Sequence, residues 1–176
     1  MDFKETEKAL NKFAKEVIRN AKRSLKSQKR IASGDLARSL NYDVDVFPNS
    51  FGLSFLMEDY GMFIDKGVQG ADPLKSKNRT SPYKYSGRFK MIPPSSLDKW
   101  VIRKGIKGVR DEKGRFIKRQ SLKYAIATSI YQKGIKASMF FTKPFEKAFR
   151  GLPENLIKAY ALDVEDFLEF TTKDNL

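Results

Sequence analysis

Apolar residues recur along the chain with two different periods. From residue 2 to residue 30 they return every three or four positions, which is the spacing of one face of a helix. Across 41–47 and 51–57 they alternate with polar residues, and 48–50 has the composition of a turn. The pattern therefore predicts a long N-terminal helix followed by a β-hairpin with one buried face.

Shorter helices are predicted where an apolar stripe lies between a capping residue and a glycine. Ser33 can cap a short helix that carries Leu36 and Leu40, and Ser95 or Ser96 can cap another. Further helices are expected within 58–67, 95–106, 120–135 and 138–149, and over 153–170.

The stripes of three of these helices define the faces that we expect to be buried. Within 95–106 the stripe is Leu97, Trp100 and Val101. Within 120–135 it is Leu122, Ala125, Ile126, Ser129 and Ile130. In the last helix it is Leu156, Ile157, Tyr160, Ala161, Val164, Phe167 and Leu168, and the polar face of that helix is acidic.

Between the hairpin and the later helices, 68–94 is rich in Pro, Gly, Ser and basic residues and is predicted to be a long loop or arm. Its apolar residues are Tyr83, Tyr85, Phe89 and Met91, interleaved with Lys84, Arg88 and Lys90. Such alternation can stack on single-stranded nucleic acid, form an edge strand, or lie on a neighbouring subunit. We favour the last, because no ribonucleoprotein signature surrounds it. A second hairpin is expected over 108–118.

The chain has no cysteine and no histidine. Disulfides, thiol nucleophiles and a Ser–His–Asp triad are therefore excluded, and an enzyme would have to use carboxylates, Lys, Tyr or carboxylate-held Mg²⁺. There is no phosphate-binding glycine loop and no nucleophile paired with a base. The carboxylate groups that a magnesium nuclease could use are Asp43 with Asp45, Glu58 with Asp59 and Asp65, and Asp111 with Glu112.

The stretch 57–67 is where an enzyme and a structural protein are most clearly distinguished. Its three acids could act as acid–base groups. The same residues also fit a short amphipathic helix that has Tyr60 and Phe63 on one face and ends at Gly67. Acids at the start of the stretch would stabilise the N-terminus of that helix.

Charge is distributed unevenly along the 176 residues, whose net charge is +14. The segment 75–119 carries fifteen Lys and Arg against three acids, whereas 151–176 carries two against six. A basic middle favours anionic partners. No apolar run approaches the roughly 18 residues that a membrane helix needs, and the start of the chain has no apolar signal core.

Three short motifs occur in a characteristic order. The first is Gly-x-Leu-x-x-Ser-Leu at 34–40, the second is the aromatic-rich stretch 59–67, and the third is "FFTKPFEKAF" at 140–149. In this order they resemble the tail-completion family of tailed bacteriophages, which are neck or minor tail components. The segments 92–106 and 124–135 are similar to an insertion in some versions of that family.

The resemblance implies one α+β domain over 1–176, in which the long helix packs on a small antiparallel sheet and a helix ends the chain. It implies that 68–138 is an inserted basic helix–hairpin–helix arm. It implies no enzyme activity, cofactor or metal, but a ring at the head–tail junction. The residues implied at subunit or partner contacts are Tyr60, Phe63, Asp65, Gly67, Pro144 and Phe145. Asp65 is expected to accept hydrogen bonds from the loop that follows.

The implied partners are copies of the chain, other neck, portal-adaptor or tail-tube proteins, and genomic DNA in the lumen, with no membrane. The implied location is the virion, and the host cytoplasm during assembly. The residues expected to face DNA or a partner are Arg79, Lys84, Arg88, Lys90, Arg103, Lys104, Lys107 and Arg110. The alternative is a non-specific nucleic-acid-binding protein that uses 75–119 as its phosphate footprint.

Overall fold

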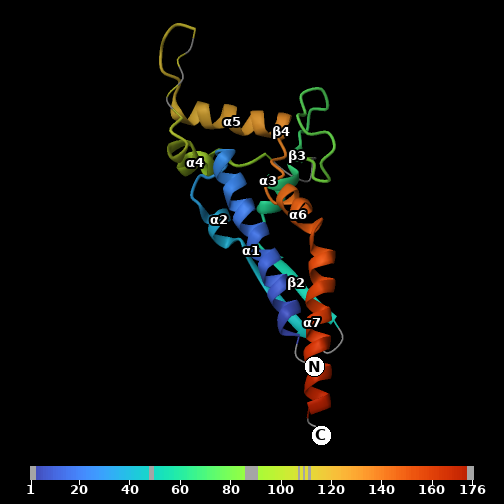
Figure 1. Ribbon diagram of the computed structural model, residues 1–176. Helices are drawn as coiled ribbons and strands as arrows, with labels where there is room; N and C mark the ends of the chain where they lie inside the picture. The colour runs from blue at the N-terminus through green and yellow to red at the C-terminus, as the bar shows by residue number, and fades with distance from the viewer. Residues whose placement is uncertain are drawn as a thin grey trace. The chain divides into compact units, whose positions relative to one another are not determined.

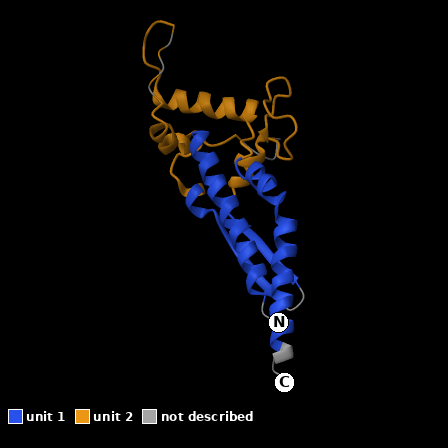
Figure 2. Ribbon diagram, viewed as in Figure 1, with its two compact units in different colours: residues 1–29, 37–58, 140–176 blue, residues 30–36, 59–139 orange. Residues whose placement is uncertain are grey.

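The computed structural model describes residues 3–47, 50–85, 91–106, 108, 110 and 112–173, of which 171–173 are described by their backbone alone. The chain forms two compact units (Figure 2). Unit 1 consists of 1–29, 37–58 and 140–176, and unit 2 consists of 30–36 and 59–139, so the predicted insertion 68–138 falls within unit 2. Several expectations concern residues outside the described ranges, namely the turn at 48–49, Arg88, Phe89, Lys90, Lys107 and Asp111.

Unit 1 has the predicted α+β composition (Figure 1). Its elements are α1 (Lys4–Ser27), β1 (Asn41–Phe47), β2 (Ser50–Leu56), α6 (Thr142–Phe149) and α7 (Leu152–Lys173). The two strands pair antiparallel, with Tyr42 opposite Phe55 and Val44 opposite Leu53. The predicted long helix and hairpin are therefore confirmed. The short helix is confirmed as α2 (Asp35–Ser39), with Leu36 and Leu40 buried and the Ser33 hydroxyl 3.4 Å from the Asp35 amide.

Aromatic rings form the centre of unit 1. Phe13 and Val17 on α1 are buried with Leu152 of α7, and Phe55 of β2 packs against this cluster. The Phe145 ring of α6 lies 5.7 Å from that of Phe13 and 5.9 Å from that of Phe55, both in edge-to-face geometry. Such rings bury large apolar areas and gain a further 0.5–1.5 kcal/mol or so per pair. The core thus joins three helices and the hairpin.

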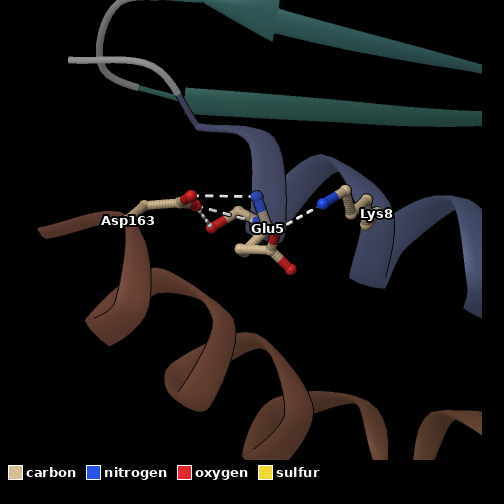
Figure 3. A network of polar contacts seen from close by, with 4 residues as sticks. Glu5, Lys8 and Asp163 are labelled. Atoms are coloured by element: carbon tan, nitrogen blue, oxygen red, sulfur yellow. Dashed lines mark hydrogen bonds and ion pairs between the residues drawn. The ribbon is translucent and has the colours of Figure 1, made fainter. Parts of the chain in front are cut away.

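Asp163 of α7 caps the N-terminus of α1 (Figure 3). Its carboxylate accepts hydrogen bonds from the Glu5 amide at 2.9 Å, the Thr6 amide at 2.9 Å and the Thr6 hydroxyl at 2.7 Å. Burial alone would raise the pKa of Asp163, which is 2% exposed, but these hydrogen bonds outweigh burial and lower the pKa below its usual value. An ionised side chain from the last helix therefore satisfies the first amides of the first helix.

The buried face of α7, which packs on the rest of unit 1, differs from the face predicted to be buried. Leu152, Ala159 and Asp163 are buried, and Leu156 packs against the core. Much of the predicted stripe is exposed, including Ile157 at 70% and Leu168 at 56%. The prediction of that buried face was wrong because α7 has apolar residues on two faces. Helix α1 covers the face of α7 that carries Asp163, the residue that caps the N-terminus of α1.

Unit 2 is built from shorter elements. They are α3 (Gly61–Lys66), β3 (Val68–Gln69), the 3₁₀ helix η1 (Pro94–Leu97), α4 (Asp98–Arg103), α5 (Arg119–Lys133) and β4 (Gly134–Ile135). Leu97, Val101 and Ala127 are buried together, and Trp100 packs on them. Lys123 of α5 donates to the Asp98 carboxylate at 2.7 Å, which lowers the pKa of Asp98. The helices of the predicted insertion thus share a small core.

Three details of unit 2 correct the sequence predictions. Ser95 and Ser96 lie inside η1, and α4 begins without a side-chain cap. In α5 Ala125 is exposed and Ala127 is buried. The apolar residues of α5 occur all around its circumference, so their spacing could not predict which face is buried. Over 108–118 the described residues form only one bridge, Arg110 with Phe116, in place of a full hairpin.

Candidate functional site

Three short backbone segments form a miniature sheet in unit 2. β3 pairs antiparallel with β4, with Val68 opposite Ile135. On its other side β3 pairs with 83–85 in parallel, because the Gln69 amide donates to the Tyr83 carbonyl at 2.7 Å and the Tyr85 amide donates to the Gln69 carbonyl at 2.9 Å. Residues 83–85 therefore pair as a short edge strand, and the rest of the segment up to residue 90 lies outside the described ranges.

Two glycines allow these backbones to approach closely. Gly67 ends α3 with φ 73°, and Gly134 ends α5 with φ 75°. A Cβ on Gly134 would collide with the Val68 carbonyl oxygen, and one on Gly67 would collide with the Ile135 carbonyl oxygen. Only glycine combines this left-handed conformation with so close an approach. The glycine stops predicted from the sequence therefore also position the miniature sheet.

The loop 70–82 is held to unit 2 by side-chain hydrogen bonds. Asn78 donates to the Lys66 carbonyl and the Ser81 hydroxyl donates to the Gly67 carbonyl, each at 2.7 Å. The Ser76 hydroxyl accepts from the Gly70 amide at 2.9 Å. The described part of the expected arm, 68–85, is thus anchored within its own unit, and its contact with a neighbouring subunit stays a prediction.

One face of the miniature sheet forms an apolar pocket. Because Val68 pairs with Ile135 and lies beside Tyr83, these residues share a face, and Tyr85 joins them two residues on. The pocket has a volume of about 530 Å³. Its lining consists of Tyr60, Phe63, Ile64, Val68, Pro82, Tyr83, Lys84, Tyr85, Ile92 and Ile135. The structure thus brings the predicted contact residues Tyr60 and Phe63 to the same pocket as the predicted basic residue Lys84.

The tyrosines of 83–85 pack on rings of their own unit. Tyr83 meets Phe63 edge to face at 4.7 Å, and Tyr85 lies 5.7 Å from Tyr131. Burial raises the pKa of Tyr85. Each ring thus has an aromatic neighbour within unit 2, and stacking of either ring on a base stays a prediction.

Lys84 lies on the outer edge of the miniature sheet. Its side chain is exposed, and the pairing with Gln69 directs that side chain to the face opposite Val68, Tyr83 and Tyr85, although the residue itself borders the pocket. Residues 83 and 85 direct their backbone groups to β3, so those of Lys84 point away from it. Among the described residues, neither the Lys84 amide nor its carbonyl takes part in a hydrogen bond.

The three acids of 57–67 differ in burial. Asp65 is 1% exposed, whereas Asp59 and Glu58 are on the surface. The Asp65 carbonyl accepts from the amides of Ser138 and Met139 at 3.1 and 3.0 Å, which ties the end of α3 to that segment. Within the ranges that the structure describes, acids form no group that could hold a metal ion, and no buried side-chain oxygen or nitrogen lacks a hydrogen-bond partner.

The remaining predicted contact residues lie in unit 1. Pro144 and Phe145 are half-buried on α6, and Phe145 belongs to the aromatic core described above. They therefore do not share a site with Tyr60 and Phe63 within one unit. Their contact with another subunit stays a prediction.

The described basic residues differ in how they are used. Arg79 and Arg103 are exposed. Lys104 donates to the Ile31 carbonyl at 3.1 Å, and Arg110 lies 4.3 Å above the Phe116 ring and donates to the Gly114 carbonyl at 2.9 Å. Lys104 and Arg110 thus stabilise their own unit, whereas Arg79, Lys84 and Arg103 remain accessible to a partner.

Nearly all of the net charge belongs to unit 2. Its residues include 20 Lys and Arg against 7 Asp and Glu, whereas unit 1 has 15 against 14. Helix α7 carries five of the 14 acids of unit 1. Of these, Glu165 and Glu169 are exposed, and the exposed Glu154 pairs with Lys158 at 2.7 Å. At 100° per residue these three acids lie along one flank of the exposed stripe of Ile157 and Leu168. The acidic flank of α7 and the basic residues of unit 2 are thus opposite in charge.

Comparison with protein-family models, with curated proteins and with solved structures gave no match. Across the part of the chain that the structure describes, no helix combines the length and the apolar character needed to cross a membrane.

Sequence reasoning missed the residues that complete the pocket. β3 and β4 have two residues each, which is too short for a periodic signal. Ile135 follows the glycine that ends α5, and Ile92 lies in a segment assigned to the loop. The available signal was the pair of glycine stops, since both Gly67 and Gly134 precede a β-branched residue.

Proposed function

We propose that this chain is a structural virion protein of a tailed phage, which forms part of a ring at the head–tail junction. The ordered motifs at 34–40, 59–67 and 140–149 support the proposal, as does the α+β fold of unit 1. The proposal assigns the chain no catalytic step.

One observation carries the assembly part of this proposal: the chain has two exposed surfaces of different chemistry, on different units. A closed ring needs a heterologous interface, in which each copy offers two different patches. The first patch is the exposed stripe of α7 with its acidic flank. The second is provided by the exposed basic residues of unit 2, which include Arg79 and Arg103.

The α7 stripe has the spacing of a helix-packing seam. Ile157, Tyr160, Val164 and Phe167 are separated by three, four and three residues, as in a coiled coil. Two α7 helices packed through this stripe would bring their acidic flanks together, which like-charge repulsion disfavours. A basic partner surface has the complementary charge.

The experiment measures the mass of the purified chain by light scattering over a range of concentrations and salt. We expect the mass to rise with concentration, and Ile157→Lys with Leu168→Lys to abolish the rise. Leu74→Lys is the matched control, because Leu74 is 89% exposed on a loop of unit 2. A chain that stays monomeric up to its solubility limit, or a multimer that the α7 variant leaves intact, would contradict the proposal.

The second candidate is non-specific binding of duplex DNA by unit 2, and the +13 of that unit favours it. Each neutralised phosphate contributes a slope of about −0.9 to log K against log salt. A dedicated binder should show a steep slope that Arg79→Glu with Arg103→Glu reduces. Weak binding that these changes leave unaltered would exclude this candidate.

A further inference from the structure

We propose that the edge strand 83–85 and the pocket beside it bind an extended segment of a partner protein in which acidic and apolar residues alternate. This inference goes beyond the proposed function, because it names the backbone conformation and side-chain chemistry of a bound segment. It rests on the geometry of unit 2 alone.

The backbone of Lys84 lies at the open edge of the miniature sheet. A peptide amide and carbonyl at a sheet edge are a template for one further strand, which binds mainly through main-chain hydrogen bonds. Here the pairing with β3 points the Lys84 amide and carbonyl outward, and neither has a partner among the described residues. An extended chain is the occupant that satisfies both groups at once.

The apolar pocket is the second feature that a bound segment would contact. It lies on the sheet face that carries Val68, Tyr83 and Tyr85, and α3 adds Tyr60 and Phe63. Tyr60 is 42% exposed and Phe63 is 39% exposed, although both line an apolar surface. A side chain on the pocket face of an added strand would cover these rings. The pocket, with a volume of about 530 Å³, can accept a large apolar side chain.

Alternation follows from the two faces of a strand. Successive side chains point to opposite faces, so the neighbours of an apolar anchor lie on the face that carries Lys84. That face presents an ammonium group, in a unit whose net charge is +13. Acidic residues are therefore the complement on this side, and cross-strand pairs of opposite charge stabilise a sheet.

The test uses the full chain and a fluorescent peptide, Gly-Asp-Phe-Asp-Leu-Asp-Gly, with binding followed by anisotropy. Its phenylalanine and leucine fall on one strand face and its aspartates on the other. Two control peptides keep its side chains. One is N-methylated at the three central residues, which removes strand donors, and the other is reordered to Gly-Asp-Asp-Asp-Phe-Leu-Gly. We expect each control to bind at least about tenfold more weakly than the first peptide. The N-methylated peptide loses one to two net hydrogen bonds, and the reordered peptide no longer places its apolar anchors on one strand face.

A matched pair of variants separates the backbone of Lys84 from its charge. Lys84→Gln removes the charge and keeps the amide, and we expect a loss of about two- to fourfold at low salt. Lys84→Pro removes both the charge and the amide N–H, and an edge strand tolerates proline. The loss of affinity beyond that of Lys84→Gln therefore measures the hydrogen bond of the backbone amide. Lys99→Gln is the control for charge alone, because Lys99 is exposed on α4 and lines no part of the pocket. Should Lys84→Pro fail to fold, the N-methylated peptide still tests the backbone bond with the unaltered chain.

Three results would overturn the inference. No binding of the first peptide would mean that Lys84 only protects an edge from pairing. Equal binding of the N-methylated peptide would mean that the pocket takes an apolar group without an added strand. Equal binding of the reordered peptide would mean non-specific attraction by unit 2. The assembly test in the preceding section alters neither Lys84 nor the pocket, so the inference and the proposed function can fail separately.

Discussion

Unit 1 and unit 2 are stabilised by different means. Unit 1 joins long helices through an aromatic core, in which Phe13, Phe55 and Phe145 meet edge to face. In unit 2 a core of three buried residues is supplemented by backbone pairing between β3, β4 and 83–85. Long amphipathic elements thus bury apolar area through their side chains, whereas short elements depend on close approach of the backbone.

The two units also differ in how they use charge. In unit 1 a buried carboxylate, Asp163, is matched by amides at a helix N-terminus. In unit 2 the half-buried acid Asp98 is paired with Arg119 and Lys123, while most other cations face solvent. The buried charge of Asp163 thus supports the fold of unit 1, whereas most cations of unit 2 are exposed.

The largest effect on stability is expected in the aromatic core. Phe13→Ala should lower the free energy of unfolding of unit 1 by about 3–5 kcal/mol, because it removes a buried ring and leaves a cavity. Chemical denaturation measures the change. Phe149→Ala is the control, because Phe149 is half exposed at the end of α6. Equal losses from both would show that the core is not centred on Phe13.

The next largest effect tests whether the close approach of backbone segments stabilises unit 2. Gly134→Ala should destabilise this unit by about 2–4 kcal/mol, since it adds left-handed strain and a collision with Val68. Gly105→Ala should cost only about 1–2 kcal/mol, because its φ is also positive but open space surrounds it. Hydrogen exchange of the α5 amides compares the two variants. Equal protection in both would mean that the miniature sheet contributes nothing.

A smaller effect tests the cap of α1. Because its pKa is lowered in the folded chain, the Asp163 carboxylate contributes stability above its unfolded pKa near 4, and this contribution is lost as pH falls through the lower folded value. Asp163→Asn should therefore cost about 1–2 kcal/mol at pH 7, and the difference from the unaltered chain should shrink in acid. Asp166→Asn, on an exposed position of α7, is the control. A difference that does not depend on pH would contradict the ionised cap.

The smallest effect concerns the exposed stripe of α7. Ile157→Lys should change the free energy of unfolding by less than about 0.5 kcal/mol, because the side chain is largely exposed in the single chain. Thermal unfolding at low concentration measures it. A loss as large as that of Phe13→Ala would mean that the stripe belongs to the core.

The sequence predicted elements more reliably than faces. The long helix and the hairpin were predictable because one apolar period runs through each. The face of α7 was not, because Ala159 and Asp163 are small or polar, and only the N-terminus of α1 explains why they are buried. In α5 apolar residues occur all around the helix, so spacing could not distinguish Ala127 from Ala125.

The candidate site was predictable in part. Tyr60, Phe63 and Lys84 were selected for different reasons, and the structure places all three at one pocket. Their proximity depends on β3, which joins α3 to 83–85 through two residues. Such a short pairing is a tertiary contact without a local pattern. The open edge at Lys84 follows from the same pairing and was equally hidden from the sequence.

The most direct test of the account asks whether the two units carry complementary surfaces. One variant combines Ile157→Lys with Leu168→Lys on α7, and the other combines Arg79→Glu with Arg103→Glu on unit 2. Light scattering measures the mass of each variant alone and of their equimolar mixture. The account predicts that neither variant assembles, while the mixture forms a one-to-one dimer through its single intact pair of surfaces. A mixture that stays monomeric while the unaltered chain assembles would contradict a head-to-tail contact between these two surfaces.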